Sequence, residues 1–160
     1  MIGIEMHLPD GKRPGYYAQV VKALADIPLF DRDKETLIVS GEPEAEAVRA
    51  LMQDYKFEYE EFGLLLLPDG ADVRPSFTDY GFESRSGNRY LMQAVTARFV
   101  FDSIGPDGNA QALAQMEEHL IASWSTDGEA CYAADSSLGE LMHGIARAYG
   151  CTVRISVPEE

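Results

Sequence analysis

The stretch that decides the fold is ACYAADSSLGELMHGIARAYGCTVRISV, residues 130–157. Apolar residues recur at helical spacing from Leu138 to Tyr149, and Gly150 follows where a left-handed C-terminal cap is expected. From Cys151 to Val157 apolar and polar residues alternate, which is typical of a strand with one buried face. The stretch therefore predicts a strand, a helix and a second strand.

The start of this helix is predicted from a capping box. Ser137 and Glu140 stand three positions apart, so each side chain can accept a hydrogen bond from the other residue's backbone N–H. The apolar stripe that follows predicts that Leu141 and Ile145 are buried. Replacing either of them with Ala is then expected to cost about 2–5 kcal/mol.

The rest of the chain repeats the alternation of strands and helices. Strand patterns occur at residues 2–8, 36–40, 57–67 and 93–102, and helix patterns begin near Pro14, Pro43 and Asn109, the last running to Trp124. Pro-Asp-Gly turns are predicted at residues 9–11, 68–70 and 106–108. The predicted fold is α+β, a single domain over residues 1–160. We expect a two-layer sandwich of one mixed sheet, with about six or seven strands and about four helices mainly on one face.

A weak internal similarity suggests that the chain contains two related halves. A shift of 94 residues lays Thr36–Glu61 over Ala130–Ile155, and it pairs Glu46 with Glu140 and Tyr55 with Tyr149. On this hypothesis the fold consists of two pseudo-repeated β-α-β-α-β halves.

The distribution of charge is the main functional feature. The net charge is −14, and no Lys or Arg occurs between Arg98 and Arg147. Such a field attracts cationic partners and repels nucleic acids and anionic membranes. We therefore predict that the acids of this interval gather on one side and bind a basic protein: Asp102, Asp107, Glu117, Glu118, Asp127, Glu129, Asp135 and Glu140. The alternative is an acidic surface that only keeps the protein soluble.

Motifs for catalysis, metals or cofactors are not found. The chain has no Gly-rich phosphate loop, no Gly-x-Ser-x-Gly motif and no Cys-x-x-Cys pair, so no cofactor and no metal are predicted. Residues 31–35 have the composition of a calcium loop, but Thr36 stands where such a loop needs Gly. No zinc pattern fits the spacing of His119, Cys131, His143 and Cys151.

Residues 74–90 mix arginines with aromatic residues. A cluster of this kind can stack on nucleic-acid bases. Because its surroundings are acidic and it contains no Lys, a packed loop or a protein contact is favoured, and no direct nucleic-acid binding is predicted.

The expected location is the cytoplasm, without a membrane anchor. No apolar run approaches the ~20 residues that cross a bilayer, and the N-terminus lacks the pattern of a secretory signal. Cys131 and Cys151 are expected to be free thiols, although a disulfide between them is conceivable.

Three function classes follow from these observations. The favoured one is a non-enzymatic acidic protein that docks a basic macromolecular partner, in an inhibitor, immunity, antirestriction or chaperone-like role. The second is a small α/β enzyme or ligand-binding domain that uses His7, His119 or His143. The third is a structural subunit, for example a homodimer, that associates through the open face of the sheet. That face is predicted to carry Glu5, His7, Arg98, Asp102, Thr152, Arg154 and Ser156.

Overall fold

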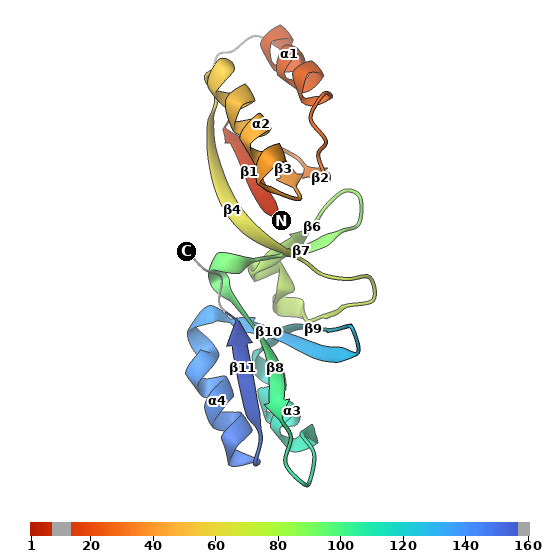
Figure 1. The fold of residues 1–160 in the computed structure, drawn as a ribbon, viewed down its shortest axis with the longest axis vertical. Helices are drawn as coiled ribbons and strands as arrows, with labels where there is room; N and C mark the ends of the chain where they lie inside the picture. Colours follow the sequence, from red (N-terminus) through yellow and green to blue (C-terminus); the bar gives the residue numbers. More distant parts are fainter. Residues whose placement is uncertain (8–13, 157–160) are drawn as a thin grey trace. The chain divides into compact units, whose positions relative to one another are not determined.

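The computed structural model describes residues 1–7 and 14–156 (Figure 1). By its contacts the chain divides into two compact units. Unit 1 comprises Met1–Leu64 and Glu83–Gly87, and unit 2 comprises Leu65–Phe82 and Asn88–Glu160. Whether the units unfold together, as the single domain predicted from the length would do, stays a prediction.

The described residues form eleven strands and four α-helices. The first six elements are β1 (Ile2–His7), α1 (Pro14–Leu24), β2 (Asp31–Asp33), β3 (Thr36–Val39), α2 (Glu42–Asp54) and β4 (Glu58–Leu66). Three short strands come next: β5 (Asp72–Val73), β6 (Gly81–Glu83) and β7 (Arg89–Met92). The last six are β8 (Thr96–Ser103), α3 (Ala110–Met116), β9 (Leu120–Thr126), β10 (Glu129–Asp135), α4 (Gly139–Ala148) and β11 (Thr152–Ser156).

The strands form two sheets rather than one mixed sheet. The six-stranded sheet has the order β2-β3-β1-β4-β7-β6, and the five-stranded sheet has the order β11-β8-β10-β9-β5. The registered strand pairs are antiparallel. The α+β class is confirmed, but the predicted single mixed sheet is wrong. The missed strands β2, β5, β6 and β7 have two to four residues each, too few to show a period of two.

Both units contain the same topology. In unit 1 the elements from β1 to β4 run strand, helix, strand, strand, helix, strand, and in unit 2 the elements from β8 to β11 do the same. The strand orders β2-β3-β1-β4 and β9-β10-β8-β11 are equivalent. This is the split β-α-β arrangement called ferredoxin-like, which by itself implies no function. The predicted shift of 94 residues relates the ends of α2 and α4, at Asp54 and Ala148, and the starts of β4 and β11, at Glu58 and Thr152. Each half is therefore β-α-β-β-α-β rather than the predicted β-α-β-α-β.

The helices of each unit cover one face of its sheet. In unit 1, Ile4 of β1 and Leu37 of β3 pack with Val48 and Met52 of α2. In unit 2, Phe99 of β8 and Val153 of β11 pack with residues of α3 and α4, among them Met116, Met142 and Ile145. The opposite face of the unit 2 sheet is partly covered, because Phe77 and Leu91 pack with Trp124 and Cys131.

The predicted helix from residue 109 to Trp124 ends early. Helix α3 stops at Met116, and strand β9 begins at Leu120. The apolar spacing resembled a helix, but the chain enters a hairpin in which Glu129 pairs with Thr126. Asp127 and Gly128 form its turn with φ of 52° and 79°, as a type I′ turn requires.

Two predictions about α4 are also wrong. Leu138 is the N-cap and makes no side-chain cap bond, so Ser137 and Glu140 form no capping box. Asp135 instead accepts hydrogen bonds from the backbone N–H and hydroxyl of Ser137, both at 2.8 Å. Ile145 is buried as predicted, at 5% exposure, but Leu141 is 41% exposed because it lies at the margin of the apolar stripe.

Helices α2 and α4 end in the same cap, a Schellman motif. The residue after the C-cap has φ of 58° in α2, at Lys56, and 74° in α4, at Gly150. The closing N–H to O bonds also match: Phe57 to Met52 and Lys56 to Gln53 in α2, Cys151 to Ala146 and Gly150 to Arg147 in α4. The cap predicted at Gly150 is confirmed. The predicted turns at residues 68–70 and 106–108 have Gly70 and Gly108 at positive φ, and the turn at 9–11 lies outside the described residues.

Candidate partner-binding surfaces

The eight predicted acids all belong to unit 2, where strand direction separates them into two groups. Strands β8 and β9 run the same way, because both pair antiparallel with β10. The first group lies at or after the ends of β8 and β9: Asp102, Asp107, Asp127 and Glu129. The second lies where β9 starts and β10 ends: Glu117, Glu118, Asp135 and Glu140. The acids are therefore divided between the two ends of these strands, and their gathering on one side to bind a partner stays a prediction.

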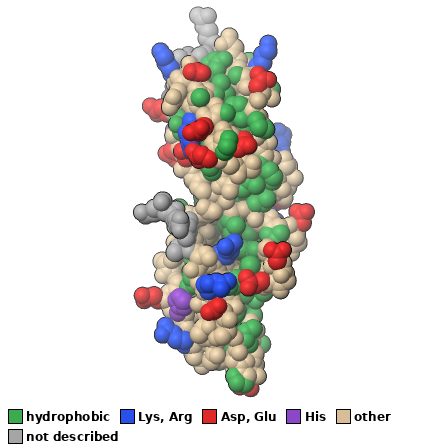
Figure 2. Space-filling model, viewed as in Figure 1, with side chains coloured by type: hydrophobic (Ala, Val, Ile, Leu, Met, Phe, Trp, Pro, Cys, Tyr) green, Lys and Arg blue, Asp and Glu red, His purple; other side chains and the backbone are tan. Residues whose placement is uncertain are grey.

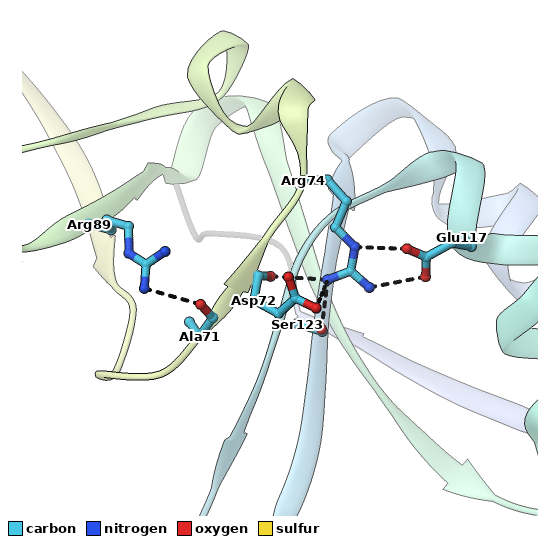
Figure 3. Close-up of polar contacts among 6 residues, drawn as sticks. All are labelled: Ala71, Asp72, Arg74, Arg89, Glu117 and Ser123. Atoms are coloured by element: carbon cyan, nitrogen blue, oxygen red, sulfur yellow. Dashed lines mark hydrogen bonds and ion pairs between the residues drawn. The ribbon is translucent and has the colours of Figure 1, made fainter.

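Glu117 is held by the guanidinium of Arg74 (Figure 3). Arg74 Nε donates to Glu117 Oε1 at 2.9 Å and Nη2 donates to Oε2 at 3.0 Å, a bidentate pair. Arg74 Nη1 also donates to Asp72 O at 3.0 Å and to Ser123 Oγ at 2.7 Å. The hydrogen bond from Arg74 lowers the pKa of Glu117 below its ordinary value. These contacts join β5, β9 and the end of α3 within unit 2.

Asp135 is occupied in a similar way. Tyr80 Oη donates to its Oδ2 at 2.7 Å, and Ser137 donates to its Oδ1. The hydrogen bond from the backbone N–H of Ser137, followed by that from Tyr80, lowers the pKa of Asp135. Asp135 therefore links the segment before α4 to the hydroxyl of Tyr80, and these contacts stabilise the fold.

The arginines and aromatic residues of 74–90 are also used within the protein. Arg89 donates to the backbone oxygen of Ala71 at 3.1 Å (Figure 3). Phe77 is buried, and Phe82 stacks on Tyr90 with ring centroids 5.3 Å apart. These contacts agree with the packed-loop interpretation of the cluster.

Two further acids of the eight have partners nearby. Arg154 lies 3.4 Å from Asp102, and His119 lies 3.3 Å from Glu118. The sequence interval without Lys or Arg is therefore not an uncompensated field, since Arg74 and Arg154 reach it from outside. Figure 2 agrees: on the face in view, acidic and basic side chains lie beside one another. Four of the eight have no ionic or hydrogen-bonded side-chain partner among the described residues: Asp107, Asp127, Glu129 and Glu140.

A second set of carboxylates lies on the sheet of unit 1; Glu5 was predicted on an open sheet face, whereas Glu58 and Glu60 were not. In the register of β1 and β4, Glu5 faces Glu60 directly and His7 faces Glu58. Residues alternate along a strand, and Ile4 and Met6 belong to the core under the helices. Glu5, Glu58 and Glu60 therefore share the helix-free face, and we call them the acidic sheet face.

The acidic sheet face is exposed and has few basic partners within residues 1–7 and 14–156. All three glutamates are exposed, and the side chain of Glu60 is 71% exposed. Among the residues that the structure describes, His7 is the basic side chain that pairs with this face, with Nε2 4.0 Å from Glu60 Oε1. On the helix side of the same strand, by contrast, Glu61 pairs with Arg49, which also binds Glu42.

The like-charged pair costs stability. Directly opposed side chains in an antiparallel sheet have Cβ atoms about 4.5–5.5 Å apart, and like charges there are unfavourable. Glu5 and Glu60 are 55 positions apart in the sequence, so their encounter depends on strand order. The available sequence signal was the alternation of Glu58 and Glu60 with aromatic residues, which predicted the strand but not its neighbour.

The histidines named as possible catalytic residues do not form one site. His7 belongs to unit 1, and His119 and His143 belong to unit 2. The ionic partners of His7 and His119 are glutamates, and the backbone oxygen of His143 accepts a hydrogen bond from Arg147 Nε at 3.4 Å. In the part of the chain that the structure describes, none of the three histidines is hydrogen-bonded to a serine or cysteine side chain.

A hollow in unit 1 measures about 1040 Å³ and is lined by residues 29–34 and 83–86. Its lining balances three acids with three bases: Asp31, Asp33 and Glu83 with Arg32, Lys34 and Arg85. Residues 31–33 form strand β2, paired with β3, so they are not a calcium loop. The balanced lining favours no one class of ligand.

Residues 1–7 and 14–156 hold neither a cluster of metal ligands nor an exposed thiol. In these ranges no three His, Cys, Asp or Glu side chains come together as a metal site requires. Both cysteines are free and buried, and burial raises the pKa of the Cys131 thiol. None of the described helices has both the length and the apolar character needed to cross a membrane.

Comparison with known proteins gives no relative. No protein-family model matches the chain, and no curated protein and no solved structure matches it significantly.

Proposed function

We propose that the protein is a non-enzymatic binding protein that docks a basic macromolecular partner, in an inhibitor, immunity, antirestriction or chaperone-like role. The observation that carries the proposal is the acidic sheet face. Glu5 and Glu60 oppose each other across two strands and are exposed, at a cost in stability that folding does not require. A cationic partner would relieve this repulsion.

Long-range attraction is the expected role of these carboxylates. The net charge of −14 attracts a basic partner, and an exposed acidic patch mainly accelerates encounter. Association should therefore slow steeply as salt is raised, while dissociation changes less.

The acids predicted from the sequence provide the competing surface. Of the eight, Asp107, Asp127 and Glu129 are exposed at one set of strand ends in unit 2 and make no described side-chain bond. We keep them as a second candidate for contact with the same partner, because Glu117 and Asp135 are already used inside the unit.

Two matched variants distinguish the surfaces. The first is Glu5→Gln/Glu58→Gln/Glu60→Gln, and the second is Asp107→Asn/Asp127→Asn/Glu129→Gln. Each removes the same amount of charge, and Asn tolerates the positive φ at position 127. The partner is first captured from cell extract at low and high salt, and its association rate is then measured with the parent and both variants.

We expect the first variant to associate about tenfold more slowly and to be at least as stable as the parent. The second variant should associate nearly as fast as the parent. An equal loss in both variants would assign the effect to net charge, and a loss confined to the second would move the site to unit 2. Parent-like rates in both would refute the proposal.

A further inference from the structure

Strand β11 forms one edge of the five-stranded sheet. It pairs with β8 on one side, and within residues 1–7 and 14–156 no strand pairs with its other side. It has five residues, more than the other edge strands β2, β5 and β6, which have three, two and three. An edge of this length presents backbone N–H and C=O groups that another strand can bind.

The equivalent segment of unit 1 differs from β11 in charge, although β4 lies between β1 and β7 and is not an edge strand. The shift of 94 residues places Glu58–Phe62 over Thr152–Ser156. The β4 segment carries Glu58, Glu60 and Glu61, whereas the β11 segment carries no acid and no proline. Charged side chains and prolines are the usual means of preventing edge-to-edge pairing. β11 has a single charge, on Arg154, and this charge already has a partner in Asp102 at 3.4 Å.

We propose that β11 pairs antiparallel with β11 of a second copy of this chain, about a two-fold axis at Arg154. The sequence Thr-Val-Arg-Ile-Ser is polar, apolar, charged, apolar and polar, so its pattern is the same from both ends. The pairing sets Thr152 opposite Ser156 and Val153 opposite Ile155, which keeps like side chains on like faces. The interface is isologous, as expected of a two-fold dimer.

Both faces of the sheet are compatible with this partner. Val153 and Ile155 belong to the core beneath α3 and α4, so the second copy extends the apolar layer. On the other face the two Arg154 side chains meet, and their repulsion is offset by the Asp102 that accompanies each. The inference is independent of the proposed function, because the acidic sheet face belongs to unit 1.

The test is sedimentation velocity of the parent protein over a wide range of concentration, with two charge-reversed variants. Arg154→Glu gives β11 the acid that β4 has at the equivalent position. Arg98→Glu is the matched control, since Arg98 is exposed on the same face but lies one strand inward, opposite Ser156. We expect a concentration-dependent dimer for the parent and the control, and a dissociation constant raised about tenfold or more for Arg154→Glu.

Cross-linking keeps the test decisive if Arg154→Glu fails to fold. Arg154→Cys places two thiols at the two-fold axis, where opposed Cα atoms lie about 4.5–5.5 Å apart, within the range that a disulfide spans, so a disulfide forms under mild oxidation. The control is Ser125→Cys, which is exposed on the inner strand β9, and the native thiols are buried. A parent that is monomeric at every concentration, or Arg154→Cys that cross-links no faster than Ser125→Cys, would overturn the proposal.

Discussion

Units 1 and 2 share one topology but distribute charge differently over it. In unit 1, three glutamates lie exposed on the helix-free face, where His7 is their basic partner within residues 1–7 and 14–156. In unit 2, Phe77 and Leu91 cover part of that face, and Arg74 and Arg154 compensate acids of their own unit. The same framework thus supports an exposed acidic face in one unit and a compensated, partly covered face in the other. Topology alone therefore assigns no function to either.

The largest loss of stability is expected from substitutions in the two cores, and these substitutions test whether the two units unfold independently. Ile4 and Phe99 are buried residues of β1 and β8, the equivalent strands of the two units. Ile4→Ala should cost about 2–5 kcal/mol and Phe99→Ala about 3–5 kcal/mol. The only tryptophan, Trp124, reports on unit 2, so its fluorescence during denaturation is compared with circular dichroism.

If the chain unfolds as the predicted single domain, Ile4→Ala shifts the Trp124 transition as well. A Trp124 transition that is unmoved while the circular dichroism transition moves would contradict the single domain and establish independent units.

The second prediction compares buried Ile145 with Leu141, which lies at the margin of the apolar stripe of α4. Ile145→Ala should lower the free energy of unfolding by about 2–5 kcal/mol, because the side chain is buried. Leu141→Ala should cost well under half as much, because Leu141 is 41% exposed. Chemical denaturation of both variants checks the order, and equal losses would show that Leu141 is covered in solution.

A smaller effect is expected from the ion pair between Arg74 and Glu117 in unit 2. Arg74→Gln should cost about 1–3 kcal/mol at neutral pH, since it removes charge-assisted hydrogen bonds from a largely buried group. The pKa of Glu117 is lowered from 4.5, so this stabilisation is present above that pH and is lost as pH falls through the lowered value.

The difference between the parent and Arg74→Gln should therefore shrink below about pH 4.5. Stability is measured by denaturation at several pH values. Arg85→Gln is the control, because Arg85 is exposed in unit 1 and should show no such dependence. A difference that stays constant down to strongly acidic pH would contradict the role of Glu117.

The smallest effects concern the two Schellman caps. Gly150→Ala should cost about 1–2 kcal/mol, because a residue with a Cβ is strained at positive φ. Lys56→Gly at the equivalent position should be neutral or stabilise by up to about 1 kcal/mol. Thermal unfolding shows whether each substitution raises or lowers the stability of the protein. A clear loss of stability in Lys56→Gly would mean that the Lys56 side chain stabilises the fold by more than its positive φ costs.

Local patterns predicted much of the secondary structure. Alternation found β1, β8 and β11, and the positions of Pro14 and Gly150 marked a helix start and a helix end that the structure confirms. One local signal was missed, since Asp127-Gly128 flanked by strand-forming residues is characteristic of a two-residue hairpin. A hairpin at this position requires a strand before Asp127, which contradicts the helix predicted up to Trp124.

The candidate surfaces were less predictable, because they depend on which strands become neighbours. The sequence by itself determined the net charge, the α+β class and the 94-residue relation between the halves, since these depend on composition and on short-range periodicity. Only the tertiary structure decided that Glu5 opposes Glu60 and that Arg74 meets Glu117, 43 residues away. Such contacts form between segments distant in the chain, and strand order and register select them. Whether an acidic side chain gains a basic partner is therefore decided only when the strands around it have paired.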